Sequence, residues 1–177
     1  VDSINTKIPV VFIEFTENSS KTCIAPDDYA IGYELGQSIT ENESDIVTVA
    51  IISENTDRDS VVLREKGLRD AIEGKVGKII NWSKKESGTN ATTRVFIQRA
   101  IVSTATDVIV TFDNTTTDSL LDALENLNKN SKVYAVSTSD KAVYNVYNKE
   151  IRVLEYPNEF SMGYLSAMYA LDNKNAG

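Results

Sequence analysis

Residues 108–124 read VIVTFDNTTTDSLLDAL, and this stretch decides the fold. Its first five residues are uncharged and mostly β-branched or aromatic, which is typical of a strand buried on both faces. Small polar residues suited to a turn and a helix N-cap follow at 113–117, and Leu120, Leu121 and Leu124 then fall at helical spacing. Open α/β sheets place their ligand contacts where a buried parallel strand ends just before a helix. The stretch therefore indicates a binding protein rather than an obvious enzyme.

The composition is that of an ordinary globular protein. The chain has 177 residues, of which 41% are hydrophobic, and this is enough for one good core or two small lobes. The uninterrupted apolar runs are far too short to cross a bilayer, so the sequence predicts no transmembrane segment. The first residues also lack the basic and apolar regions of a signal peptide, and none is expected within this chain.

Charge and residue usage exclude several classes of function. A net charge of −8 argues against nucleic-acid binding by these residues, because phosphate contacts need clustered Lys and Arg. The single cysteine, Cys23, excludes an internal disulfide and a multi-cysteine zinc site. The absence of histidine excludes histidine-based catalysis and zinc binding, and we expect neither a metal nor a cofactor.

Strand-like and helix-like segments alternate along the chain. The expected strands cover residues 9–15, 47–52, 78–82, 108–112, 132–136 and 151–156, and the expected helices cover 27–39, 59–73, 92–102, 119–127, 141–147 and 160–171. Strict alternation predicts a parallel sheet covered on both faces. The predicted fold class is therefore α/β, a three-layer α/β/α lobe with a central, mainly parallel, Rossmann-like sheet. The carboxyl ends of strands 47–52, 108–112 and 132–136 should share one edge.

Five short motifs occur in a fixed order between residues 8 and 171. They are IPVVFIE at 8–14, PDDYAIG at 26–32, REKG at 64–67, the unit at 107–124, and YPNEFSMGY at 156–164. The first resembles the last strand of the N-terminal lobe in one protein family. The other four resemble, in order, that family's D-N-Y-x-x-G helix start, its R-x-x-G motif, its D-x-I-x-x-x-N-D…A-L unit and its Q-x-P-x-x-M-G-Y motif. That family is the type I periplasmic-binding-protein fold, which includes ribose- and galactose-type solute-binding proteins and the effector domains of lac-repressor-like regulators.

The resemblance implies half of a larger domain. The family's domain has two lobes, joined by three crossovers, that close on the ligand by a hinge. Residues 1–15 would be the last strand of the N-terminal lobe with the hinge, and residues 16–177 the C-terminal lobe. The rest of the domain would lie outside both ends of this chain.

The resemblance also implies a set of ligand contacts at strand ends. Glu14 stands where the family has an acidic sugar contact, and Arg64 stands where it aims a guanidinium into the cleft. Asp113 takes the position of an Asn or Asp contact, and Glu155 stands where relatives carry Gln. Ser139 or Asp140, after the fifth strand, is the remaining candidate. Carboxylates accept hydroxyl hydrogens and arginine donates in a fixed fork, so this set suits a polyhydroxylated ligand.

Three of these candidates also have a plainer structural interpretation. Glu14 could be a solvated strand end, Arg64 a surface residue of an already charged helix, and Asp113 a helix N-cap, unless Asn114 or Thr115 caps instead. Trp82 could stack on a sugar ring, although packing at the edge of the core is favoured. Cys23 is expected to be a small buried hydrophobe.

The predicted function is binding of a small polar solute of the sugar type, as the substrate-binding component of an ABC-type transporter. Such a protein would lie outside the cytoplasm, anchored or secreted, with a permease as its partner. The alternative is the effector-binding domain of a cytoplasmic lac-repressor-like regulator, which could form a homodimer. Paired carboxylates could serve glycoside chemistry, but no obvious nucleophile with its base is present, so we predict no enzyme. The ligand's identity stays open, because Phe15, the turn at 137–140 and Glu155 depart from the ribose-type pattern.

Overall fold

The computed structural model describes residues 11–13, 22–44, 46–53, 58–84, 87–129 and 131–174. The chain divides into two compact units. The larger unit is Asp28–Tyr156, and the smaller unit combines Val1–Asp27 with Pro157–Gly177. No helix in the described ranges is long and apolar enough to span a membrane.

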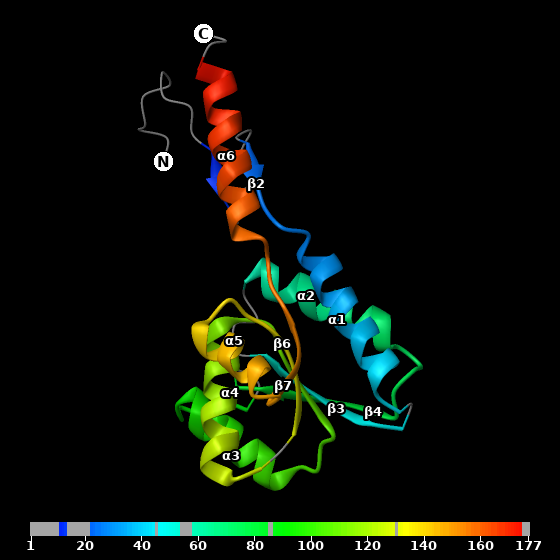
Figure 1. Ribbon diagram of the computed structural model, residues 1–177. Coiled ribbons are helices and arrows are strands. Elements are labelled where there is room, and N and C mark those ends of the chain that lie inside the picture. The colour runs from blue at the N-terminus through cyan, green and yellow to red at the C-terminus, as the bar shows by residue number, and fades with distance from the viewer. Residues whose placement is uncertain are drawn as a thin grey trace. The chain divides into compact units, whose positions relative to one another are not determined.

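A five-stranded parallel sheet forms the middle of the larger unit, with the strand order β4-β3-β5-β6-β7 (Figure 1). Its strands are β3 (Thr48–Ser53), β4 (Lys78–Ser83), β5 (Val108–Thr111), β6 (Lys132–Val136) and β7 (Ile151–Glu155). Because all five strands run the same way, their carboxyl ends share one edge, which we call the carboxyl edge. This confirms the predicted fold class and the predicted grouping of strand ends.

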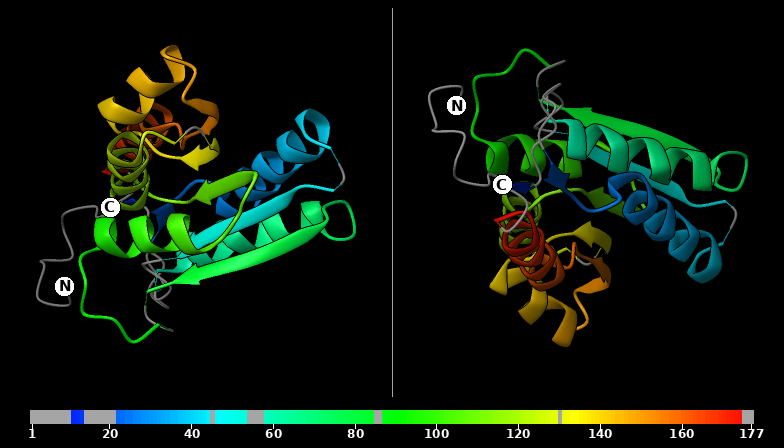
Figure 2. Two further views of the ribbon diagram at one scale, coloured as in Figure 1. Left: turned by 90° about the horizontal axis from the view of Figure 1, so that it is seen from below. Right: turned by 90° about the horizontal axis from the view of Figure 1, so that it is seen from above.

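Helices cover both faces of the sheet (Figures 1 and 2). On one face lie α1 (Asp28–Asn42) and α2 (Asp59–Ile72), and on the other α3 (Thr93–Ser103), α4 (Asn114–Leu127) and α5 (Asp140–Tyr147). In β3, Val49 and Ile51 join the core beneath α1 and α2, whereas Ala50 and Ile52 join the core beneath the other three helices. The strand is buried on both faces, which explains its continuous apolar sequence.

The helix after β5 begins five residues earlier than the sequence predicted. Asp113 caps α4, because its Oδ1 accepts a hydrogen bond from the Thr116 backbone N–H at 2.9 Å. Thr117 is fully buried and its hydroxyl lies 2.8 Å from that of Thr111. The polar run that the sequence suggested as a turn is therefore the first turn of the helix, with its hydroxyl groups satisfied internally.

The end of α1 is tied to the amino-terminal part of β6. The Glu43 side chain is 1% exposed, and it accepts hydrogen bonds from Lys132 Nζ and, at 2.9 Å, from the hydroxyl of Tyr134. Burial, followed by the hydrogen bond to Glu43, raises the pKa of Tyr134, so this phenol stays a neutral donor. The contact fixes where α1 lies over the sheet.

The smaller unit pairs two short parallel strands with a long helix. Its elements are β1 (Phe12–Ile13), β2 (Cys23–Ile24) and α6 (Glu159–Lys174), which packs against both strands. The Thr22 hydroxyl donates to the Tyr169 hydroxyl at 2.7 Å, which links this helix to the segment before β2. Cys23 is exposed, so the expectation that it is buried is wrong. Strand β2 was not predicted.

The compact units have boundaries different from those expected for the lobes. The sequence placed 16–177 in one lobe, whereas the larger unit runs only from Asp28 to Tyr156 and α6 groups with β1 and β2. Of the expected strand at 9–15, the structure describes β1 and the residue before it. Glu14 and Phe15 lie outside the described residues. The assignment of 1–15 and 16–177 to different lobes stays a prediction.

Candidate functional site

The carboxyl edge brings four of the five predicted site residues to one side of the sheet. Asp113 directly follows β5 and Ser139 lies just after β6. Glu155 is the last residue of β7, and Arg64 reaches the end of β5 from α2. Strands lie about 4.8 Å apart, so the ends of β5 and β7, with β6 between them, are separated by about 10 Å. The fifth residue, Glu14, lies outside the described residues.

Arg64 is buried at this edge rather than exposed on the helix surface. Its Nε donates to Asp28 Oδ1 at 2.7 Å, and its Nη1 donates to the backbone carbonyl of Phe112 at 2.8 Å. The two charged side chains are 10% and 11% exposed. Nη2 has no hydrogen-bond partner among the described residues, so these residues leave its two N–H donors available.

Glycines allow α2 to hold Arg64 in this place. A Cβ on Gly67, one turn after Arg64, would lie 2.1 Å from the carbonyl oxygen of Tyr29. A Cβ on Gly32 would lie 1.9 Å from the carbonyl oxygen of Arg64 itself. The backbones of α1 and α2 are therefore in direct contact, and this approach puts Asp28 within reach of the guanidinium. The R-x-x-G spacing thus has a physical cause in the crossing of the helices.

Asp113 caps its helix with both carboxylate oxygens. Besides the bond from the Thr116 N–H, Oδ2 accepts the Thr116 hydroxyl at 3.0 Å. The residue is buried, at 8% exposed. The alternative that Asn114 or Thr115 caps α4 is wrong. Each carboxylate oxygen has a second lone pair, so capping leaves acceptor capacity for a ligand.

Ser139 is used more completely by the fold. Its Oγ accepts from the Ala142 N–H at 3.1 Å, which caps α5, and donates to Asp118 Oδ1 at 2.6 Å. The Ser137 hydroxyl also points to it, at 3.3 Å. The fold therefore uses the single O–H donor of Ser139 and most of its capacity to accept hydrogen bonds. This makes Ser139 the weakest of the four candidates. Asp140 is exposed as the first residue of α5.

Glu155 differs from the others because its side chain has no hydrogen bond or ion pair within the described ranges. Its backbone carbonyl accepts from the Ser137 N–H at 3.1 Å, which keeps the end of β7 beside β6. Partial burial of the carboxyl raises its pKa, and the negative charge of Glu34 on α1 adds to this shift. An acceptor without a donor is thus available at the carboxyl edge.

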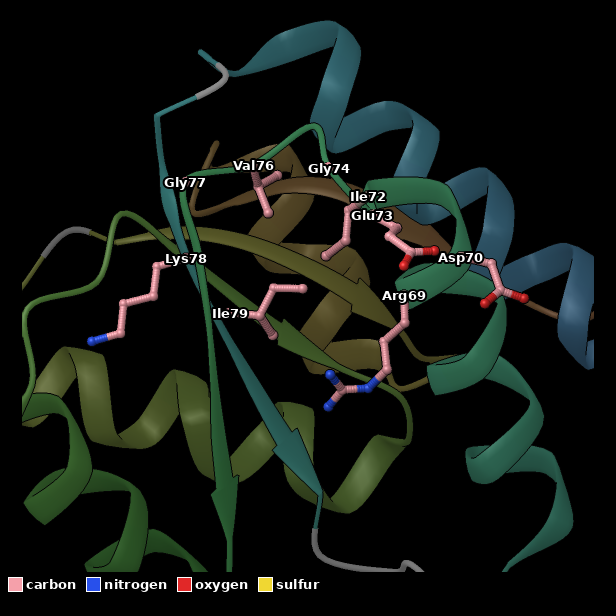
Figure 3. A pocket seen from close by; sticks show the side chains of 9 residues that line it. All are labelled: Arg69, Asp70, Ile72, Glu73, Gly74, Val76, Gly77, Lys78 and Ile79. Carbon is pink, nitrogen blue, oxygen red and sulfur yellow. The ribbon is translucent and has the colours of Figure 1, made fainter.

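A shallow hollow of about 440 Å³ lies elsewhere, at the opposite end of α2, beside Arg69, Glu73 and Lys78 (Figure 3). Arg69 already donates to Glu65 and Asn81. None of the predicted site residues lines this hollow. Trp82 is 5% exposed and belongs to the core cluster on the side of the sheet that α3, α4 and α5 cover, in line with the plainer interpretation.

Sequence reasoning missed Asp28. From the sequence, Asp28 was interpreted only as part of a helix start. In the structure it is the hydrogen-bond partner of Arg64, which lies 36 positions later in the chain. One signal was present, because Asp28 takes the Asn position of the D-N-Y-x-x-G pattern. A carboxylate in place of an amide at a helix start near the site indicates a cation close by.

Comparison with known proteins shows which family the chain belongs to. Among solved structures, the chain is similar to the XylFII molecule, with a TM-score of 0.80 and 16% identity over 95% of this chain and 64% of that one. It is also similar to GanP, a glucose-galactose binding protein from Geobacillus stearothermophilus, with a TM-score of 0.76 and 18% identity over 96% and 62%. A putative LacI-family transcription repressor from Corynebacterium glutamicum gives 0.76 and 15% over 95% and 64%.

These likenesses show the fold, and the chain spans less than two thirds of each of these three structures. No curated protein matches the chain. A family model described as the periplasmic binding protein domain matches residues 3–176. The chain therefore belongs to the periplasmic binding protein domain family.

Proposed function

We propose that this chain is part of a solute-binding domain and that its carboxyl edge contacts a small polar ligand of the sugar type. One observation carries the proposal: Arg64 is buried and fixed by Asp28 and the Phe112 carbonyl, yet its Nη2 has no partner among the described residues. A buried donor without a partner is costly, and a ligand that accepts its hydrogen bonds would remove that cost. Asp113 and Glu155 supply acceptors for hydroxyl groups along the same edge.

The finer proposal is a substrate-binding component of an ABC-type transporter that works outside the cytoplasm with a permease as partner. The glucose-galactose binding protein among the similar structures supports the solute-binding part of this role. The alternative, an effector-binding domain of a cytoplasmic regulator, is supported by the similar LacI-family repressor. A lipobox or a helix-turn-helix segment in the full-length protein would discriminate between the two. The family is one of binding proteins, and we propose no catalysis.

Calorimetry on the full-length protein tests the proposal. The titrants are a panel of pentoses, hexoses and cyclitols, and the same panel is then applied to an Arg64→Ala variant. We expect at least one member to bind the wild type and to bind the variant more weakly, by roughly 1–3 kcal/mol. Failure of every panel member to bind the wild type would refute a sugar-type ligand.

A further inference from the structure

We infer that Asp28 sets the charge of the proposed ligand site. By pairing with Arg64 inside the fold, it makes the carboxyl edge select uncharged or amine-bearing sugars over acidic sugars. This inference rests on the proposed function and adds the class of ligand to it. Arg64 then acts on the ligand as a source of hydrogen bonds rather than as a net positive charge.

Asp28 and Arg64 form a close ion pair that is shielded from water. The Asp28 carboxylate lies 2.7 Å from Arg64 Nε, and both side chains are about nine-tenths buried, at 11% and 10% exposed. Charges this close and this far from water interact strongly, so the carboxylate offsets most of the guanidinium's field. An amide at position 28 would accept the same hydrogen bond but would leave the positive charge uncompensated. The D-N-Y-x-x-G pattern has that amide, and this chain does not.

The other charged groups near the carboxyl edge are mostly carboxylates. Asp113 at the end of β5 and Glu155 at the end of β7 are carboxylates, and Glu34 on α1 is close enough to raise the pKa of Glu155. The amine of Lys141, on α5, is paired with Asp122. At the start of α2, the exposed residues Arg58 and Asp59 have opposite charges. Lys84, directly after β4, and Asp140, the first residue of α5, also have opposite charges. With Arg64 compensated, carboxylates therefore outnumber cations among these groups, which makes the edge negative.

A negative edge with free acceptors discriminates between sugars of the same shape. A carboxylate on the sugar would approach like charges in a partly buried site, which is unfavourable. An uncharged sugar can still accept from Arg64 Nη2 and donate to Asp113 and Glu155. An ammonium group would give Glu155 the positive partner that it lacks among the described residues.

Matched sugars of three charges test this inference in the full-length protein. The probes are D-glucose with D-glucosamine and D-glucuronate, and D-galactose with D-galactosamine and D-galacturonate. Calorimetry at pH 7 gives the affinity ratio between the uncharged or amine form and the acid for the wild type and for Asp28→Asn. Glu73→Gln is the matched control, because it removes one negative charge from an exposed position at the far end of α2.

We expect the wild type to bind the uncharged or amine form at least about tenfold more tightly than the acid, and Asp28→Asn to shrink this ratio by about tenfold. Glu73→Gln should leave it unchanged. The inference is overturned if the wild type prefers the acid, or if Asp28→Asn, shown by its melting curve to be folded, keeps the wild-type ratio. Both results leave the proposed function standing. If no probe binds the wild type, the proposed function fails and the inference fails with it.

Discussion

At the scale of single residues, the carboxyl edge mixes groups that hold the fold with groups left available. Among the described residues, Arg64 makes two hydrogen bonds to distant parts of the chain and none through Nη2, whereas Asp113 uses both oxygens to cap α4. Substitutions to alanine would remove both kinds of contact at once. Variants that keep more of the structural role than alanine does are therefore needed beside Arg64→Ala to separate the two kinds of contact.

Arg64→Lys in the full-length protein should weaken binding of its sugar at least about tenfold. Lysine keeps the positive charge opposite Asp28 but lacks the fork that presents Nη1 and Nη2 together. Calorimetry measures the affinity, and a thermal melt confirms that the variant is folded. Wild-type affinity in this variant would mean that Arg64 serves only the packing of α1 on α2.

Asp113→Ala should lower the free energy of unfolding by about 1 kcal/mol, because α4 loses its cap. Asp113→Ser should keep most of that stability, since serine caps helices about as well as aspartate, but its shorter side chain no longer reaches a ligand. Urea titrations compare the stabilities and calorimetry compares the affinities. A serine variant with full affinity would show that Asp113 is a cap and nothing more.

The raised pKa of Glu155 predicts how the stability of the protein depends on pH. Its pKa is raised in the folded protein by burial and then by Glu34, so the carboxylate form is disfavoured relative to the unfolded chain. Below the pKa that this group has in the unfolded chain, its contribution to the stability of the fold is fully present. The contribution is lost as the pH rises through the higher pKa of the folded protein. Glu155→Gln should therefore be more stable than the wild type at pH 7. Urea titrations should find this advantage gone below the ordinary glutamate pKa of 4.5; an equal advantage at both pH values would contradict it.

At the scale of elements, α1 is held at both ends, and its crossing with α2 builds the site. Asp28 ties its start to Arg64, and Glu43 ties the region after its end to Tyr134. Between these points the glycines of both helices allow the backbones to touch. The position of the guanidinium thus depends on how closely two helices cross, as well as on its own hydrogen bonds.

Gly67→Ala should destabilise the larger unit by at least about 1–3 kcal/mol, because its Cβ would lie 2.1 Å from the Tyr29 carbonyl oxygen. Gly163→Ala in α6 is the matched control, since no described atom lies within 4 Å of its Cβ and alanine favours a helix. Thermal or urea unfolding compares the two variants. Equal stabilities would mean that α1 and α2 can separate without cost.

Elements could be predicted where one local pattern decided them. The run of residues 108–112 predicted β5, because a strand buried on both faces excludes charged residues. The start of α4 was missed, since a polar run reads as a turn until the Thr111–Thr117 contact shows it buried. Strand β2 has two residues in a polar context, and the pairing of Asp28 with Arg64 joins positions 36 apart. Neither leaves a periodic signal in the sequence.

At the scale of the whole molecule, the sheet, its two cores and the carboxyl edge all lie within the larger unit. The similar structures are longer, and this chain covers 62–64% of the three described above. We propose that the ligand is contacted from two sides, with the carboxyl edge supplying one of them. A single side leaves the ligand and the edge residues open to water, which competes for each hydrogen bond.

This chain alone should therefore bind its sugar feebly. A micromolar complex corresponds to about 8 kcal/mol, and losing about half of it leaves millimolar affinity. Calorimetry with the same sugar on this chain and on the full-length protein makes the comparison, and circular dichroism with a melting curve confirms that the shorter chain is folded. Micromolar binding by this chain alone would mean that the site lies wholly within it. In that case no second lobe would be needed to shield the Arg64 donors from water. The proposal that the ligand is contacted from two sides would then be wrong.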